Sequence, residues 1–433
     1  MKRKELDNLL KWKKSKNRKP LIIRGARQVG KTWLMKEFGK TAYEQYVYIN
    51  LEMSKHLQQI FDDYSNIQNI INALQIESNK TITPENTLII LDEIQEVPNA
   101  VSSLKYFYEN APEYHVIAAG SLLGIALHKN TSFPVGKVNF LNLYPLNFIE
   151  FLQALNEKQL ADLVETQNWT LIKTFKNKYI QLLKYYYFIG GMPEAVAEFS
   201  ENNDLQEVRK IQKNILFAYE QDFSKHAPGS IIPRIRMLWN SIPAQLAKEN
   251  KKFIYGLIKK GARAKEYELA LSWLIDCGLV YKVHNIKKPA LPLKAYTEFS
   301  AFKLFTVDTG LLSAMSNLDA HTLIEGNTVF EEFKGAITEQ YVLQQLLTQE
   351  NTDIYYWSSP KSTAEIDFLL QNKNKIIALE VKATENLQAK SLKVFKQKYN
   401  PDLAVRSSMS DYRKENWMIN VPLYAIHTLT NIE

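Results

Sequence analysis

The sequence is poor in cysteine and has no long apolar run. Its 433 residues include a single cysteine, Cys277, which excludes a framework of internal disulfides and is typical of a reducing compartment. No apolar run reaches the length that crosses a membrane, and Lys and Arg interrupt the N-terminus too often for a secretory signal. We therefore expect a cytoplasmic chain without a membrane partner, long enough for about three domains.

The excess of positive charge is confined to one arm. The first 19 residues hold nine Lys and Arg against two Asp and Glu, so +7 of the net +8 lies there and the remaining chain carries +1. A case for nucleic-acid binding must therefore rest on local patches. Leu6, Leu9, Leu10 and Trp12 mostly share one helical face, which favours packing on the first domain over contact with a phosphate backbone.

A glycine-bounded loop follows the first predicted strand, Leu21–Ile23. Gly25 and Gly30 frame four residues and are followed by Lys-Thr, which is the complete phosphate-binding pattern. Such a loop turns its backbone N–H groups toward a polyphosphate, and the next helix directs its positive end at the same charge. A chance glycine loop is the disfavoured alternative. The predicted triphosphate-binding residues are Gly25, Ala26, Arg27, Gln28, Val29, Gly30, Lys31 and Thr32.

A second strand, Thr87–Leu91, ends in two carboxylates. Four consecutive aliphatic residues are typical of a central parallel strand whose carboxyl end meets a ligand. Asp92 and the Thr32 hydroxyl are predicted to hold Mg²⁺, with Asp92 acting through water, while Lys31 reaches the terminal phosphates. Glu93 is the predicted base that orients and deprotonates the attacking water. Hydrolysis of ATP is favoured over binding alone.

A third strand, Val116–Ala119, leads to Ser121. Its hydroxyl is a candidate polar sensor of the terminal phosphate, although a Gly-Ser pair after a strand is by itself more often a turn. Strands that alternate with helices and carry sites at their ends predict a doubly wound α/β domain over about the first 150 residues.

The C-terminal part contains a second predicted site. Glu339 falls on the apolar face of a predicted helix, where a carboxylate needs a partner or a metal. Asp367 lies on a predicted strand, and Glu380 and Lys382 share one face of the next strand. Glu339, Asp367 and Glu380 are the predicted ligands of a second Mg²⁺, and Glu380 and Lys382 are the predicted catalytic pair for phosphodiester cleavage.

The middle of the chain is predicted to be helical and aromatic. Tyr185–Phe188 is read as core in preference to a base-stacking platform. Residues 242–282 suggest a winged-helix unit in which Pro243 opens one helix and Ala264–Ile275 forms the next. DNA contact or simple domain packing would both suit that unit. Basic residues cluster at two places: Lys251, Lys252, Lys259, Lys260, Arg263 and Lys265, and then Lys390, Lys393, Lys396 and Lys398.

Together these motifs resemble the bacterial and archaeal AAA-type ATPases that carry a C-terminal DUF4143 domain. The resemblance implies the roles given above for Lys31, Thr32, Asp92, Glu93 and Ser121. Relatives often have Arg where this chain has Lys137, and Lys lacks the bidentate fork, so a finger role is in doubt. The segments that carry the resemblance are Gly25–Thr32, Leu91–Gln95, Gly120–Gly124, Phe133–Lys137, Gly190–Val196 and Asp222–His226.

The C-terminal site is similar to the PD-(D/E)XK nuclease fold, with Ile366 in place of the motif's proline. We therefore expect four domains: an AAA-type ATPase domain at 1–150, a helical lid or linker at 151–230, a winged-helix-like domain at 231–299, and a restriction-endonuclease-like α/β domain at 300–433. The expected cofactors are ATP and Mg²⁺, with DNA as the candidate partner and oligomerisation open. The alternatives are a nucleotide switch that binds a protein partner with an inactive nuclease fold, and a DNA-binding ATPase whose nuclease fold is degenerate.

Overall fold

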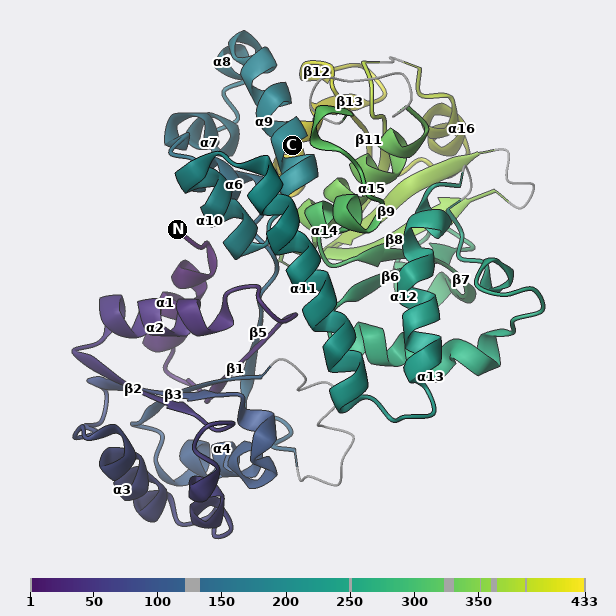
Figure 1. Ribbon diagram of the computed structural model, residues 1–433. Coiled ribbons are helices and arrows are strands. Elements are labelled where there is room, and N and C mark those ends of the chain that lie inside the picture. Colours follow the sequence, from purple (N-terminus) through teal and green to yellow (C-terminus); the bar gives the residue numbers. More distant parts are fainter. Residues whose placement is uncertain are drawn as a thin grey trace. The chain divides into compact units, whose positions relative to one another are not determined.

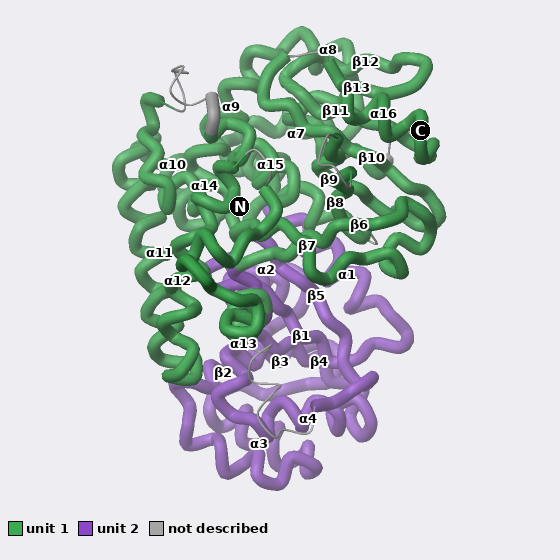
Figure 2. Tube along the Cα trace, turned by 90° about the vertical axis from the view of Figure 1, so that its right-hand side faces the viewer, with its two compact units in different colours: residues 1, 145–275, 280–433 green, residues 2–144, 276–279 purple. Residues whose placement is uncertain are grey.

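The computed structural model describes residues 2–120, 133–248, 251–322, 331–350, 352–359, 364–385 and 388–431. These residues form two compact units, coloured separately in Figure 2. Unit 2 holds residues 2–144 and 276–279, and unit 1 holds residues 145–275 and 280–433 with Met1. In the part of the chain that is described, no helix combines the length and the apolar character needed to cross a bilayer. The finer division into four domains stays a prediction.

Unit 2 is built on a parallel sheet of five strands in the order β2-β3-β4-β1-β5 (Figure 1). The predicted strands before Gly25, before Glu93 and before Gly120 are confirmed as β1, β3 and β4. The five strands are β1 (Leu21–Arg24), β2 (Gln45–Asn50), β3 (Thr87–Asp92), β4 (His115–Ala119) and β5 (Asn139–Asn142). Because all five are parallel, their carboxyl ends meet at one edge, where the phosphate loop begins.

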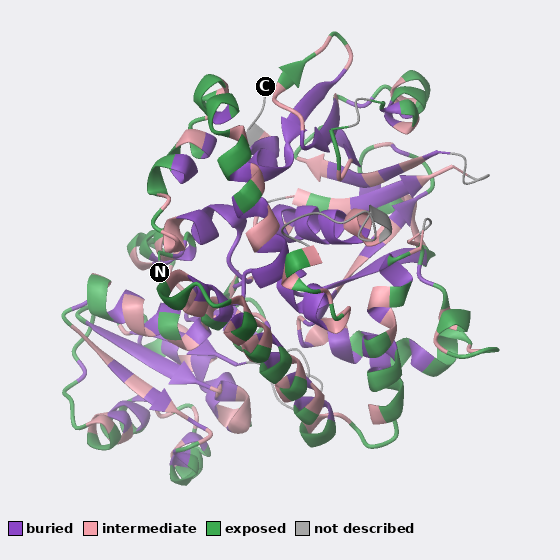
Figure 3. Cartoon of the chain, turned by 45° about the horizontal axis from the view of Figure 1, so that its top comes forward, coloured by how far each residue is buried: buried purple, intermediate pink, exposed green. Residues whose placement is uncertain are grey.

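Among the described residues of unit 2, four α-helices accompany this sheet. They are α1 (Glu5–Lys14), α2 (Lys31–Ala42), α3 (Ile67–Ser78) and α4 (Pro98–Asn110). All six residues of β3 are buried, as expected for a strand covered on both faces (Figure 3). In α1, Leu9 and Trp12 are buried whereas Leu10 is 40% exposed, so only part of the predicted apolar face packs on the domain. Between β2 and β3 the chain forms a short 3-10 helix, Lys55–Phe61, and then α3.

Unit 1 begins with a series of helices and adds three more within its C-terminal half. The bounds are α6 (Phe148–Ala154), α7 (Lys158–Glu165), α8 (Trp169–Thr174), α9 (Lys176–Ile189), α10 (Pro193–Asn202), α11 (Leu205–His226), α12 (Ile232–Leu246), α13 (Ala264–Asp276), α14 (Thr309–Met315), α15 (Glu331–Leu347) and α16 (Lys390–Tyr399). Tyr186, Tyr187 and Phe188 of α9 are almost fully buried, so the prediction that this aromatic run belongs to the core is confirmed.

The Gly190-Gly191 break after α9 has a structural cause. Gly190 has φ +77, and a Cβ on Gly191 would lie 2.1 Å from the carbonyl oxygen of Leu146. The Gly191 amide donates to the Asp308 carboxylate at 2.6 Å, and the Gln344 side chain donates to the same group at 3.0 Å. Asp308 also caps α14, so this one buried carboxylate ties α9, α14 and α15 together.

The second sheet is mixed and has eight strands in the order β12-β13-β11-β10-β9-β8-β6-β7. The predicted strands that carry Asp367 and Glu380 are confirmed as β9 and β10, although Lys382 directly follows β10 and does not lie in it. The strands are β6 (Val280–Ile286), β7 (Thr297–Thr306), β8 (Thr352–Ser358), β9 (Glu365–Asn372), β10 (Lys375–Val381), β11 (Leu403–Ser408), β12 (Arg413–Lys414) and β13 (Ile419–Pro422). β6, which begins within the predicted winged-helix unit of residues 242–282, pairs with both β7 and β8 and is therefore part of this sheet.

One detail of the predicted winged-helix unit is wrong. Pro243 does not open a helix but lies inside α12, four residues before its C-cap residue Ala247. The second helix, α13, is confirmed, and the strand after Gly278 is β6. The predicted boundary between residues 299 and 300 falls inside β7.

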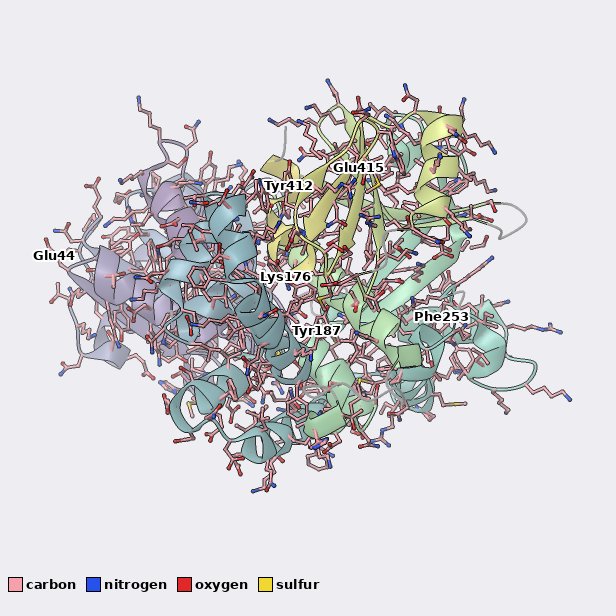
Figure 4. All side chains as sticks on the ribbon, turned by 90° about the horizontal axis from the view of Figure 1, so that it is seen from above. Glu44, Lys176, Tyr187, Phe253, Tyr412 and Glu415 are labelled. Atoms are coloured by element: carbon pink, nitrogen blue, oxygen red, sulfur yellow. The ribbon has the colours of Figure 1, made fainter. Side chains whose placement is uncertain are left out.

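Helices α8 and α9 contact the segments that connect the C-terminal strands of the same unit. The rings of Trp169 and Tyr412 stack with centroids 4.1 Å apart, and Lys176 forms an ion pair with Glu385 at 2.5 Å. Lys176 and Tyr412 lie near each other in Figure 4. These contacts join the first helices of unit 1 to its sheet, so the helical and mixed parts form one core.

Candidate functional site

The loop between β1 and α2 has the backbone geometry that its glycines predict. Gly25 has φ +150 and Gly30 has φ +93, values that side chains rarely permit. A Cβ on Gly25 would lie 2.2 Å from the carbonyl oxygen of Leu143, so the close approach of that backbone requires glycine. Gln28 also has a positive φ of 65. The loop therefore encloses a tight turn directly before the N-terminus of α2.

Lys31 is folded back onto its own loop. Its ammonium donates to the carbonyl oxygens of Gly25 at 2.9 Å and Ala26 at 2.8 Å, and the residue is only 6% exposed. Burial lowers the pKa of Lys31 to about 8, although the charges of Glu93 and Asp92 oppose this shift. The ammonium is thus held by two carbonyls that a polyphosphate would outcompete electrostatically.

Thr32 and Asp92 meet at the carboxyl edge of the sheet. The Thr32 hydroxyl donates to Asp92 Oδ2 at 2.6 Å, and the Tyr48 hydroxyl donates to the same oxygen at 3.0 Å. Burial, followed by the charge of Asp92, raises the pKa of Tyr48 to about 12, so the phenol keeps its proton. A hydroxyl and a carboxylate side by side are hard oxygen donors, which fit Mg²⁺. Tyr48 was not predicted, although it lies in a strand next to β3.

Glu93 directly follows β3 in a left-handed conformation, with φ 50. Its Oε2 accepts a hydrogen bond of 2.7 Å from the side chain of Gln95. Asp92 Oδ1 accepts from the Glu93 amide at 3.1 Å, which fixes the turn between the two carboxylates. The strand end therefore directs the two acids differently: Asp92 pairs with Thr32, and Glu93 is held separately by Gln95.

The predicted C-terminal residues converge, but a lysine lies among them. Lys303 of β7 is fully buried; its ammonium lies 3.4 Å from Glu339 Oε2 and 4.0 Å from Asp367 Oδ1, and it forms an ion pair with Glu365. We call Glu339, Glu365 and Asp367 the acid cluster. Glu339 also forms an ion pair with Lys251. Lys251 was predicted to belong to a basic surface patch and instead faces this carboxylate.

The two central acids of the cluster differ in charge. Burial raises the pKa of Asp367, and the neighbouring charge of Glu339 raises it further. Burial acts on Glu339 in the same direction, but Lys251 and Lys303 outweigh it and lower the pKa of Glu339. A hydrogen bond joins the two carboxyl groups. The proton therefore resides on Asp367 and the negative charge on Glu339.

Glu380 and Lys382 form a pair of their own. Lys382 Nζ lies 2.9 Å from Glu380 Oε1, while Glu380 Oε2 is buried and has no hydrogen-bond partner among the described residues. The Val381 amide, between them, donates to Asp367 Oδ2 at 2.8 Å, so Glu380 and Asp367 come from adjoining strands. Across the described ranges, no three His, Cys, Asp or Glu side chains are arranged to hold a metal ion. With an ammonium among them, the predicted ligands do not fit Mg²⁺ as they stand.

Family comparisons agree with the geometry of unit 2. The family described as "AAA domain" matches residues 17–152, which include the phosphate loop, Asp92 and Glu93. Residues 17–152 are thus similar to this family, and we refer to them below as the AAA domain. Two further families match downstream: a domain of unknown function, DUF8612, at residues 180–322, and a domain of unknown function, DUF4143, at residues 334–426.

Solved structures similar to this chain include a Walker-type ATPase of Pyrococcus abyssi, with 16% identity over 73% of this chain and 95% of that one, at a TM-score of 0.45. The ORC of Drosophila bound to DNA has 16% identity over 72% and 93%, at a TM-score of 0.30. The ORC1 protein of Aeropyrum pernix in complex with DNA has 13% identity over 72% and 91%, at a TM-score of 0.27. A comparison with curated proteins finds no significant match.

Two predicted residues of the AAA domain, Ser121 and Lys137, do not join the contacts made by Lys31, Thr32, Asp92 and Glu93 among the described residues. Ser121 lies outside the described residues. Lys137 precedes β5, whose first residue, Asn139, pairs with Leu21 at the end of β1 opposite the phosphate loop. Its ammonium forms an ion pair with Glu109 at 2.9 Å. Lys137 therefore lies at the edge of its own sheet that is opposite the phosphate loop.

A residue before the AAA domain supports the phosphate loop and was not predicted. Arg3 is 4% exposed and donates to the carbonyl oxygens of Val29 at 3.1 Å and Tyr144 at 2.6 Å. Holding the Val29 carbonyl on the outside favours a loop whose amides face inward. No sequence signal distinguishes Arg3, because it is one of nine basic residues in the N-terminal arm.

Proposed function

We propose that the AAA domain binds ATP with Mg²⁺ and hydrolyses the terminal phosphate. The observation that carries this proposal is the hydrogen bond of 2.6 Å between Thr32 and Asp92. It brings together the two side chains that would hold magnesium, directly beside the loop that would receive the phosphates. When bound, Mg²⁺ would neutralise and orient the phosphate oxygens.

Each residue of the chain has a distinct proposed task. The amides of residues 25–30 would donate to the phosphates, and Lys31 would exchange its two carbonyl acceptors for phosphate oxygens. Glu93 would accept the proton of the attacking water, while Gln95 keeps its carboxylate oriented. Ser121 stays the proposed polar sensor of the terminal phosphate.

Steady-state ATP turnover with Mg²⁺ tests this proposal. We expect Glu93→Gln to keep nucleotide binding and to lose about a hundredfold or more in turnover, because the base is removed but the loop is intact. Lys31→Ala should lose both binding and turnover. Lys40→Ala, an exposed lysine of the same helix α2, serves as the control and should behave as wild type. Unchanged turnover in Lys31→Ala would mean that the assignment is wrong.

We propose DNA as the macromolecular partner of this ATPase. Lys259, Lys260, Arg263 and Lys265 are all exposed in the segment that leads into α13, where they could contact phosphates. The competing proposal is a nucleotide switch that binds a protein partner. A phosphate-contacting patch would make ATP turnover depend on added DNA, whereas a switch for a protein partner would not respond.

The test measures ATP turnover with duplex, branched and single-stranded DNA. Stimulation by any of the three supports DNA as the partner. Lys259→Glu combined with Lys260→Glu should abolish the stimulation without changing the basal rate. Lys158→Glu combined with Lys213→Glu is the matched control, because these two lysines are also exposed but lie on α7 and α11. Equal turnover in the absence and presence of every DNA would contradict the proposal.

A further inference from the structure

The acid cluster of unit 1 encloses a positive charge that belongs to the chain itself. Lys303 lies in the middle of β7, has no exposed surface and directs its ammonium at all three carboxyl groups of the cluster. Glu339 comes from α15, whereas Glu365 and Asp367 come from β9. One lysine therefore joins a helix and a strand that are distant in the sequence.

We propose that Lys303 is the resident cation of the acid cluster and takes the place that a divalent metal ion would need. A divalent ion binds carboxylate oxygens at about 2.0–2.6 Å and requires about six oxygen donors. The Lys303 ammonium is hydrogen-bonded to Glu339 at 3.4 Å, is paired with Glu365 and lies 4.0 Å from Asp367, so it occupies the space between these oxygens and repels a divalent ion electrostatically. The cluster then binds neither Mg²⁺ nor Mn²⁺, and the unit does not cleave phosphodiesters through it.

The surrounding charges support this inference. Lys251 forms an ion pair with Glu339, and Lys382 forms one with Glu380 at 2.9 Å. Two further ammonium groups therefore offset the negative charge of the same region. Four carboxyl groups thus face three lysines. Buried carboxylates without compensating charge are strongly destabilising, which explains how a charged lysine, Lys303, can lie in the core. The negative charge of these carboxyl groups is offset by lysines of the chain itself and does not require a metal ion.

One observation marks where a metal ion could bind if Lys303 were removed. Glu380 Oε2 is buried without a hydrogen-bond partner among the described residues. A cation that entered the cluster would gain this oxygen in addition to those of Glu339 and Asp367. In the present arrangement no three acidic side chains of the described residues are placed to hold a metal ion. We therefore expect a metal site only once Lys303 is removed and the carboxyl groups can draw together around a cation.

The first test uses the wild-type chain. Mn²⁺ binding to the nucleotide-free protein is measured by electron paramagnetic resonance and compared with Asp367→Asn. We expect the same number of bound ions and affinities within about twofold, because the cluster binds no metal in the wild type. Loss of a bound Mn²⁺ in Asp367→Asn would overturn the proposal. Asp92→Asn in the presence of ADP is the positive control, since it removes a ligand of the proposed nucleotide-site metal and should weaken Mn²⁺ binding.

The second test removes the ammonium. Lys303→Met should bind one Mn²⁺ ion that the wild type does not bind. Its affinity for this ion should exceed by at least about tenfold any residual affinity of the wild-type cluster. The gain should disappear in Lys303→Met combined with Glu339→Gln. Lys282→Met, on the neighbouring strand β6, is the matched control and should gain no site. A folded Lys303→Met protein without a new site would contradict the proposal. If this variant does not fold, the wild-type comparison decides, independently of whether the AAA domain hydrolyses ATP.

Discussion

Nucleotide affinity is expected to fall as the pH rises from 7.5 to 9, because Lys31 loses its proton in the empty loop. Burial lowers the pKa of Lys31 to about 8. Only the ammonium form can attract phosphates, so binding above this pH must take up a proton. The stability of the nucleotide-free protein depends on pH in the opposite direction. Between a pH of about 8 and the ordinary lysine pKa, the unfolded chain binds more protons than the folded chain, so the free energy of unfolding rises with pH through that window.

The magnitude follows from the protonated fraction of Lys31. At pH 9 a pKa of about 8 leaves roughly one side chain in eleven protonated, against about three in four at pH 7.5. If the bound phosphates restore the ordinary lysine pKa, the apparent dissociation constant rises about eightfold over this interval. About 0.9 proton should be taken up for each nucleotide bound at pH 9.

Calorimetry with a non-hydrolysable ATP analogue measures both quantities. Titrations at each pH, repeated in buffers with different heats of ionisation, give the affinity and the number of protons exchanged. Lys31→Arg is the control, because guanidinium stays charged throughout this range and its affinity should not depend on pH. A wild-type affinity that is constant from pH 7.5 to 9, without proton uptake, would refute the reasoning about the buried ammonium.

Three further substitutions test the geometry of the two units. Thr32→Val removes the hydroxyl donor at the magnesium site, and Mg²⁺-dependent ATP turnover should fall about a hundredfold. Gly25→Ala directs a methyl group at the carbonyl of Leu143, so nucleotide-induced thermal stabilisation should be lost. Asp308→Ala leaves the Gly191 amide and other buried donors unpaired, which should lower the free energy of urea unfolding by about 3–5 kcal/mol.

Conservative variants separate these effects from general damage. Thr32→Ser keeps a hydroxyl and should retain turnover within about threefold of wild type. Gly229→Ala adds a methyl group where nothing lies within 4 Å and should leave nucleotide binding unchanged. Asp308→Asn keeps an acceptor oxygen and should cost less stability than Asp308→Ala. If a control variant lost as much turnover, nucleotide binding or stability as the disruptive variant with which it is compared, the named contact would not be the cause of the loss.

The nucleotide site could be predicted in detail because its residues follow local rules. Gly25, Gly30, Lys31 and Thr32 are close together in the sequence, and their spacing fixes the turn that they form. Asp92 could be added because parallel strands end at one edge of a sheet. By contrast, Arg3 reaches this site from the segment before α1 and Tyr48 from β2, and neither residue lies in a distinguishing sequence pattern.

The sequence by itself determined the residue types of the C-terminal site, its strands and the helix that carries Glu339. Only the tertiary structure decided that Lys303 lies among Glu339, Glu365 and Asp367, because β7 reaches them through its pairing with β6, and β6 with β8. Local periodicity assigns a side chain to a face of its strand, but it does not say which distant strand lies beside it. A lysine in an apolar strand is therefore ambiguous until the sheet is assembled, and its charge then decides what the neighbouring acids can bind.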